Sequence, residues 1–184
     1  MTWSAPITFA DNTPLYAAQM NTYLRDNLME TMVAKATTEG AWFMTDGPNR
    51  VVERIPTVGR LSTSGDTTSS TSYADLDNSS GPSITVDTGS QALVIMSLHC
   101  KNDGGGGAAS GSLMSVQIDG ASTIAATDNY MVEVGAQAAT YEWGLSNLFF
   151  ARDLTSGTNI FTAKYRVTGG IMTVGNATLI VVPF

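Results

Sequence analysis

Residues that combine chemical reactivity with a useful spacing are few in this sequence. His99 and Cys100 are its single histidine and single cysteine, and they are neighbours in an apolar run. That run has the composition of a strand, in which adjacent side chains point to opposite faces. We therefore do not expect the two residues to act as a nucleophile and its base, and they are too few for a typical zinc site. The expected role of Cys100 is a buried structural thiol.

Two segments resemble ligand-binding loops but depart from the patterns that the chemistry needs. Glycines occupy positions 104–107, yet neither a Lys-Ser/Thr pair nor a helix start follows them, as phosphate binding by a P-loop requires. Asp75, Asp77 and Asn78 resemble the beginning of a calcium loop. The twelfth position of that loop is Val86, where a bidentate glutamate should stand. We therefore expect no metal and no cofactor.

The acidic residues and the serines do not form a recognisable active site either. The acidic residues of the carboxyl-terminal half are scattered, at Asp128, Glu133, Glu142 and Asp153. A glycosidase needs two carboxylates that face each other across a cleft, and no spacing here predicts such a pair, although folding could bring two of them together. There is no GxSxG nucleophile elbow, and a lone histidine among many serines is weak support for a triad. We do not expect an enzyme.

Three aromatic residues, Tyr130, Tyr141 and Trp143, are candidates for binding a sugar. An aromatic ring offers apolar area to the C–H face of a pyranose, while polar neighbours hold the hydroxyl groups. Tyr141 and Trp143 lie on the same side if residues 140–151 form one strand. Aromatic residues are also common in sheets for reasons of packing alone, and we prefer that interpretation.

The elements that must position these residues begin with a predicted helix over residues 13–32. Thr13 offers a side-chain oxygen to the amides of a first turn, and Pro14 suits the first helical position because its missing N–H costs nothing there. Apolar side chains then recur at four-residue spacing, at Met20, Leu24 and Leu28. The helix is therefore amphipathic, and a helix of this length needs a partner for its apolar face. That partner is either the β domain of this chain, or other copies and a larger assembly.

An extended arm is predicted before the helix and a hairpin after it. In the arm, Trp3, Ile7 and Phe9 alternate loosely with polar residues, so the arm either adds to a sheet or lies on a neighbour. The hairpin pairs residues 41–45 with residues 50–55 across a turn of sequence Asp-Gly-Pro-Asn.

The remainder of the chain predicts a β-sandwich with Gly, Asn, Asp and Ser between its strands. The strand candidates are residues 60–63, 72–76, 83–87, 91–101, 112–119, 122–126, 140–151, 159–168 and 176–184. Polar and apolar residues alternate in segment 159–168, so one of its faces is exposed to water. The runs Ala-Leu-Val-Ile-Met and Leu-Ile-Val-Val are apolar on both sides, as expected in the middle of a sandwich or at a subunit interface.

We therefore predict a mainly β chain, with a jelly-roll-like antiparallel β-sandwich preceded by an extended arm and one amphipathic amino-terminal helix. Residues 1–57 are expected to form an attachment and oligomerisation region of arm, helix and hairpin. Residues 58–184 are expected to form the sandwich domain. A chain of 184 residues is long enough for one well-buried domain of this kind.

Composition and charge narrow the classes of function. The 9 Lys and Arg residues against 16 Asp and Glu residues leave a net charge of −7, with a pI near 4.4. An acidic chain without a basic cluster repels phosphate backbones, so we exclude nucleic acid as a partner. The first residues lack a basic n-region, and the longest apolar runs are far too short to span a bilayer. We expect a soluble protein that is made in the cytoplasm and does not insert into a membrane.

Several stretches resemble small structural proteins of tailed bacteriophages, especially those of actinobacteria. The first is TWSAPITFADNTPLYAAQMNTYLRDNLMET, and the others are TTSSTSYADL, GPSITVDTGSQALVIMS, TNIFTAKYRVTGG and ATLIVVPF. The likeness spans nearly the whole chain, and none of these stretches is a catalytic motif. Tyr16 departs from it, because a small or polar residue is more usual there. The resemblance implies a virion protein of the decoration, head-fibre or minor tail type that forms a homo-oligomer, with a trimer as the favoured form.

The expected function is therefore structural. The amino-terminal region docks on the particle, against the major capsid protein or other virion proteins, and the sandwich is displayed on the virion surface as a capsid decoration or head-fibre protein. The side chains expected to carry this oligomer or particle attachment are Trp3, Ile7, Phe9, Met20, Leu24 and Leu28. The alternative is a minor tail or receptor-binding module that recognises host glycans through Tyr130, Tyr141 and Trp143. An enzyme that acts on the cell envelope is a third hypothesis.

Overall fold

A computed structural model of the chain describes residues 14, 16–29, 35–48, 50–61, 64–104, 110–135 and 142–184. Contacts between Cα atoms divide the chain into two units, Met1–Ile55 with Phe184, and Pro56–Pro183. The first unit contains a helix and a hairpin, and the second contains the sandwich. The division after Ile55 falls close to the boundary that the sequence predicts after residue 57.

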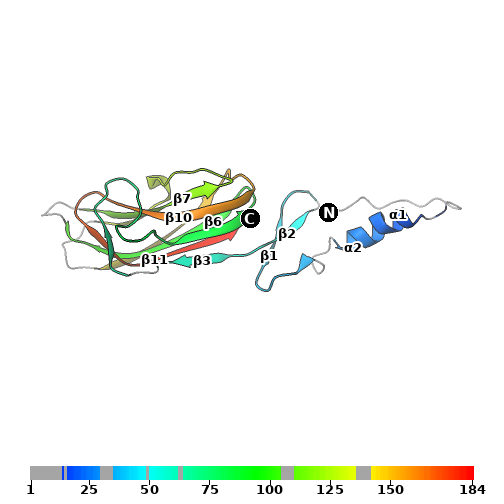
Figure 1. The fold of residues 1–184 in the computed structure, drawn as a ribbon, viewed down its shortest axis with the longest axis horizontal. Coiled ribbons are helices and arrows are strands. Elements are labelled where there is room, and N and C mark those ends of the chain that lie inside the picture. Colours follow the sequence, from blue (N-terminus) through cyan, green and yellow to red (C-terminus); the bar gives the residue numbers. More distant parts are fainter. Residues whose placement is uncertain are drawn as a thin grey trace. The chain divides into compact units, whose positions relative to one another are not determined.

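The helix of the first unit begins later than expected. Its described part consists of α1 (Ala17–Met20), a π-helical turn (Asn21–Asp26) and α2 (Asn27–Met29) (Figure 1). Tyr16 precedes it in an extended conformation, and the backbone N–H of Tyr16 donates to Oε1 of Gln19 at 3.1 Å. The predicted start at Thr13 and Pro14 is wrong, because this glutamine caps the helix at Tyr16 and leaves Pro14 outside it. Thr13 and residues 30–34 lie outside the described residues.

The first unit also contains the predicted hairpin. Strands β1 (Trp42–Thr45) and β2 (Val51–Arg54) pair antiparallel across the turn. In the turn, the backbone N–H of Asp46 donates to the carbonyl of Arg50, and the two side chains form an ion pair at 3.1 Å. Glu53 of β2 accepts hydrogen bonds from the backbone N–H and the hydroxyl of Thr37, at 2.6 and 2.7 Å. The segment around Thr37 is thereby held against the hairpin.

The second unit is a sandwich of two antiparallel sheets. The larger sheet has the order β3 (Thr57–Arg60), β11 (Met172–Pro183), β6 (Ala92–Asn102) and β9 (Trp143–Ala151), and the short β4 (Asp66–Thr68) also pairs with β11. The smaller sheet has the order β5 (Ser83–Thr88), β10 (Gly157–Val167), β7 (Ser112–Gly120) and β8 (Val132–Val134). Figure 1 shows β7 and β10 of the smaller sheet lying over β6 and β11 of the larger one.

The order of the strands is that of a jelly roll. Leaving out the short β4, the described strands of the sandwich can be counted along the chain from β3. The larger sheet then contains the first, eighth, third and sixth strands in that order, and the smaller sheet contains the second, seventh, fourth and fifth. Most connections therefore cross from one sheet to the other, as in a double Greek key. The predicted fold class, a mainly β chain with a jelly-roll-like sandwich, is confirmed.

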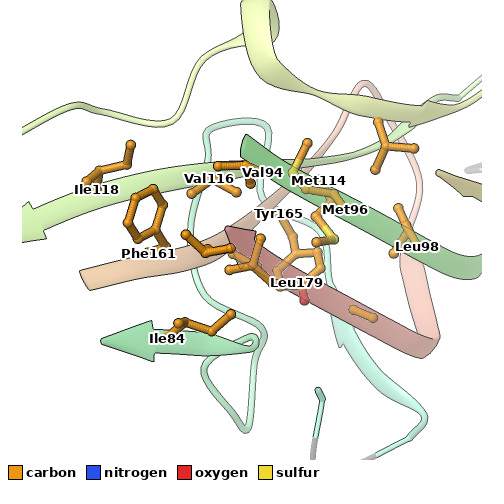
Figure 2. Packing of buried hydrophobic residues seen from close by; sticks show 14 of the residues in the cluster. Ile84, Val94, Met96, Leu98, Met114, Val116, Ile118, Phe161, Tyr165 and Leu179 are labelled. Carbon is orange, nitrogen blue, oxygen red and sulfur yellow. The ribbon is translucent and has the colours of Figure 1, made fainter. Parts of the chain in front are cut away.

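The core lies between the two sheets and follows the alternation of side chains along each strand. On β10, the residues Phe161, Tyr165 and Val167 are buried, while the polar residues between them are only partly covered. Figure 2 shows the rings of Phe161 and Tyr165 among apolar side chains of the neighbouring strands, which include Val94, Met96, Leu98, Met114, Val116 and Leu179. The alternation predicted for this segment is confirmed.

The alternation of residues predicts two strands that the structure shows only as single β-bridges, and it misses two short strands. Residues 72–76 and 122–126 form single β-bridges instead of strands. In the second segment, the backbone N–H of Ser122 donates to Oδ1 of the buried Asn159 at 2.7 Å, and this side-chain bond takes the place of a ladder bond. The strands β4 and β8, at three residues each, are too short for a period of two to be recognised.

Gly81 packs directly on the ring of Tyr165. A Cβ atom at position 81 would lie 2.7 Å from Cε2 of Tyr165 and 2.8 Å from the carbonyl oxygen of Ala163. Both neighbours belong to the central strand β10 and are fully buried, so neither can move away without disturbing the core.

We expect Gly81→Ala to lower the free energy of unfolding by about 1–3 kcal/mol, the usual cost of overpacking a core. Urea unfolding followed by circular dichroism measures the change. Gly135→Ala is the matched control, because no heavy atom lies within 4 Å of a Cβ at that position. Equal unfolding midpoints for the two variants would show that the contact with Tyr165 does not constrain position 81.

Candidate functional site

His99 and Cys100, the most reactive pair in the sequence, are separated by the alternation of β6. Cys100 lies in the core and is 1 % exposed; burial raises the pKa of its thiol to about 11, although a hydrogen bond with Ser112 opposes the rise. His99 lies on the other face of the sheet, where its Nε2 is 3.6 Å from Oε2 of Glu142. The expected placement of the two side chains on opposite faces of the sheet is confirmed, and a buried, protonated thiol is inert.

Two acidic residues that the sequence singled out are paired with basic residues. Oδ1 of Asp75 lies 2.9 Å from Nζ of Lys164. Asp128 accepts two hydrogen bonds from Arg166, at 3.1 and 2.7 Å, and one from the hydroxyl of Tyr73 at 2.8 Å. The bonds from Arg166 and then Tyr73 lower the pKa of Asp128, so this carboxylate stays ionised and does not suit a general acid. In the part of the chain that the structure describes, no group of three or more His, Cys, Asp or Glu residues could hold a metal ion.

Asp66 is a buried carboxylate that sequence reasoning missed. It stands at the start of β4, is 4 % exposed, and accepts hydrogen bonds of 2.6–3.3 Å from Thr67, Asn78 and Ser79. Burial by itself raises the pKa of Asp66, but the bonds from Ser79, Asn78 and Thr67 together outweigh it and lower the pKa. Asn78, which belongs to the segment that resembles the beginning of a calcium loop, and the following Ser79 therefore serve as donors to Asp66.

The candidate sugar-binding aromatics do not form one platform among the described residues. The ring of Tyr130 stacks on that of Phe149, with centroids 4.5 Å apart and an angle of 22° between the planes. Trp143 lies on the same strand as Phe149, and its side chain is 45 % exposed. Six residues of strand, about 20 Å, separate Phe149 from Trp143, so Tyr130 and Trp143 present separate surfaces. Tyr141 lies outside the described residues.

Of the six residues expected to carry attachment, Met20, Leu24 and Leu28 lie in the described helix. Their exposed fractions are 39, 51 and 59 %. We refer to these three side chains as the helix stripe. Trp3, Ile7 and Phe9 lie outside the described residues.

A second exposed apolar surface lies on the outer face of the larger sheet. Leu148 of β9 is opposite Ile95 of β6, Ile95 is opposite Ile180 of β11, and Ile180 is opposite Val58 of β3. We refer to these four residues as the apolar row. Leu148 and Val58 are 61 and 53 % exposed, and the two isoleucines are half-buried. The signal for this surface in the sequence is the pair of runs that are apolar on both sides.

The chain has a distant likeness among solved structures. It is similar to a structure described as "CBM35 from Cellvibrio japonicus Abf62", with 14 % sequence identity and a TM-score of 0.32, over 70 % of this chain and 98 % of that one. No protein-family model and no curated protein matches the sequence. A likeness at that level carries no argument about function. Among the described helices, none is long and apolar enough to cross a membrane.

We expect Asp66→Asn to lower the free energy of unfolding at pH 7 by about 1–3 kcal/mol, because an amide in this place leaves buried donors without an acceptor. The lowered pKa of Asp66 means that its contribution is present above the unfolded value, which is near 4, and is lost as the pH falls through the folded value. The difference in stability between the native protein and the variant should therefore shrink on acidification from pH 7 to pH 3.

Chemical denaturation at several pH values measures this difference. Asp77→Asn is the control, since Asp77 is exposed and accepts its side-chain bond from the hydroxyl of Thr67 alone. A difference between Asp66→Asn and the native protein that does not change with pH would contradict the role given to the carboxylate.

Proposed function

We propose that this chain is a non-enzymatic structural protein of a tailed-phage particle, of the capsid decoration or head-fibre type. Its amino-terminal region attaches to the particle, and its sandwich is displayed on the virion surface. The observation that carries the proposal is the helix stripe, whose side chains are 39–59 % exposed in a unit distinct from the sandwich. The resemblance of the sequence to structural proteins of tailed phages supports the same assignment.

The reactive side chains of the sandwich also support a structural role. Cys100 is protonated in the core, and Asp66 and Asp128 are each held by several hydrogen bonds from the protein. The two aspartates stabilise turns and loops, and the pKa values of all three groups are shifted away from the range in which acid–base catalysis works near neutral pH.

Burial of the helix stripe supplies a driving force for attachment. Burying one exposed leucine or methionine side chain contributes about 1.5–3 kcal/mol, so three partly exposed side chains contribute a few kcal/mol per copy. A contact of that strength is weak for a single chain. Many copies on one particle, or several in a homo-oligomer, bind together with much higher avidity. The proposed partners are other copies of this chain and the major capsid protein or another virion protein.

We expect Leu24→Asp to weaken binding of the purified protein to particles that lack it by about tenfold or more, since a charge in the helix stripe must be desolvated when the stripe is covered. Co-sedimentation with the particles over a range of protein concentrations measures the affinity. Thr22→Asp adds the same charge at an exposed, polar position of the same helix and should bind as the native protein does. Undiminished binding of Leu24→Asp would show that the helix stripe does not serve attachment.

A second candidate function, recognition of host glycans, rests on the exposure of Trp143. Its ring is 45 % exposed, and Leu145, two residues along β9, is 44 % exposed beside it. An exposed tryptophan beside an apolar side chain is a surface on which a sugar ring can stack.

If this surface binds glycans, oligosaccharides from the host envelope will quench the tryptophan fluorescence saturably. The quenching will be lost in Trp143→Phe and retained in Trp42→Phe, which removes another exposed tryptophan. Quenching that is equal in the two variants, or absent in the native protein, would contradict glycan binding at Trp143.

A further inference from the structure

The two sheets of the sandwich have different outer faces. On the smaller sheet, the outward residues of β10 include Thr162, Lys164 and Arg166, and the two basic side chains make ion pairs with aspartates. On the larger sheet, the apolar row crosses four strands without a charged residue. A sheet that faces water on one side normally alternates between apolar inner and polar outer residues. The part of the outer face around the apolar row is therefore composed like a surface that is covered.

The apolar patch on this face has clear limits. Next to the apolar row, Phe150 of β9 lies opposite Leu93 of β6 and extends the patch in one direction. In the other direction the neighbouring row is polar, and it consists of Ser146, Ser97, Thr178 and Arg60. Exposed apolar patches with a polar rim are typical of sites where another protein surface docks.

The dimensions of the patch favour a helix as its occupant. Four strands spaced about 4.8 Å apart make the apolar row about 14 Å long, and its two rows of side chains are about 7 Å apart. A patch of that size is far below the roughly 800 Å² per partner of a standard stable interface, so it forms one part of a larger contact. The helix stripe extends over nine residues, from Met20 to Leu28, which is about 12 Å on a helix about 10 Å wide. The stripe and the row therefore match in length, and neither contains a charge.

We propose that the helix stripe of one copy docks on the apolar row of a second copy of this chain. The inference rests on the proposed function in that the homo-oligomer is part of it, and it names the two surfaces that form the contact. Each chain carries one stripe and one row, so the contact closes either into a symmetric dimer, when two copies exchange stripes, or into a ring when the rotation between copies allows it. The trimer expected from the sequence is such a ring with three identical contacts. In this arrangement the row of a neighbouring copy covers the stripe, so Leu24→Asp weakens particle binding through the loss of the avidity that the trimer provides.

The test measures the mass of the purified full-length chain by light scattering after size-exclusion chromatography. We expect the native protein to form an oligomer of the 19.3 kDa chain. Leu24→Asp, which changes the helix stripe, and Leu148→Asp, which changes the apolar row, should each be monomeric. Val58→Asp changes the row at another exposed position and should behave as Leu148→Asp does. Thr22→Asp on the helix and Thr85→Asp on the outer face of β5 are exposed polar controls that should keep the native mass.

Mixing the variants provides the decisive measurement. Leu24→Asp retains an intact row and Leu148→Asp an intact stripe, so an equimolar mixture regains one contact per pair of chains. Its mass should rise towards that of a dimer at high protein concentration, where a single weak contact is populated, while each variant alone stays monomeric at the same concentration. Such rescue also shows that both variants are folded. A monomeric native protein, an oligomer that survives Leu148→Asp, or a mixture that stays monomeric would each overturn the inference.

The oligomer and the particle are separate readouts. The mass measurement uses the purified chain alone, so it does not depend on whether the chain belongs to a virion. Native oligomers that do not bind particles would contradict the proposed function and leave the contact between copies intact. Conversely, particle binding by a monomeric native protein would support the proposed function and overturn the contact between copies.

Discussion

The pairing of β6 with β11 is the contact on which the rest of the sandwich depends. The two strands run side by side from Ala92 opposite Pro183 to Asn102 opposite Met172, and they form the middle of the larger sheet. β9 adds to the outer side of β6, while β3 and β4 add to β11. Because the paired segments are far apart in sequence, a long loop must close before any of these contacts can form. The hydrogen bonds to the buried Asp66 also depend on β11, because β4 pairs with β11 and Asp66 of β4 lies opposite Val174.

A single register shift in β11 allows its pairing with β6 to direct the apolar side chains of both halves of β11 into the core. The register shifts between Val174 and Asn176, which makes a β-bulge around Gly175. A Cβ at Gly175 would lie 2.7 Å from Nδ1 of His99, so a larger residue there would displace the His99 side chain. Before the bulge the buried residues are the even-numbered Met172 and Val174, and after it they are odd-numbered, as at Leu179. Without the extra residue, the second half of β11 would present its core side chains to solvent. The bulge also places Ile180 on the outer face, in the apolar row.

The sequence predicts those features that depend on neighbouring residues, and it misses those that depend on contacts between distant segments. Alternation within β6 correctly places Cys100 inside and His99 outside, because only neighbouring residues are involved. The same alternation breaks at Gly175, which is why the last strand is predicted from residue 176 although β11 begins at Met172. Asp66 could not be identified, since its donors on Asn78 and Ser79 lie 12 and 13 residues away and only the folded chain brings them together. The register that aligns the apolar row is equally non-local.

The sandwich architecture explains only one side of the two runs that are apolar on both sides. From the sequence, Ala-Leu-Val-Ile-Met and Leu-Ile-Val-Val fit either the middle of a sandwich or a subunit interface. The structure places both runs in the middle of the larger sheet, and that position accounts for the inner residues such as Val94 and Leu179. A sandwich has two layers, however, so each sheet has a single inner face, and nothing in that arrangement accounts for Ile95 and Ile180 on the other side. Apolar side chains on both faces of one sheet fit an arrangement with a third layer, and the amphipathic helix of another copy is an element of this chain with the length and the apolar surface for that position.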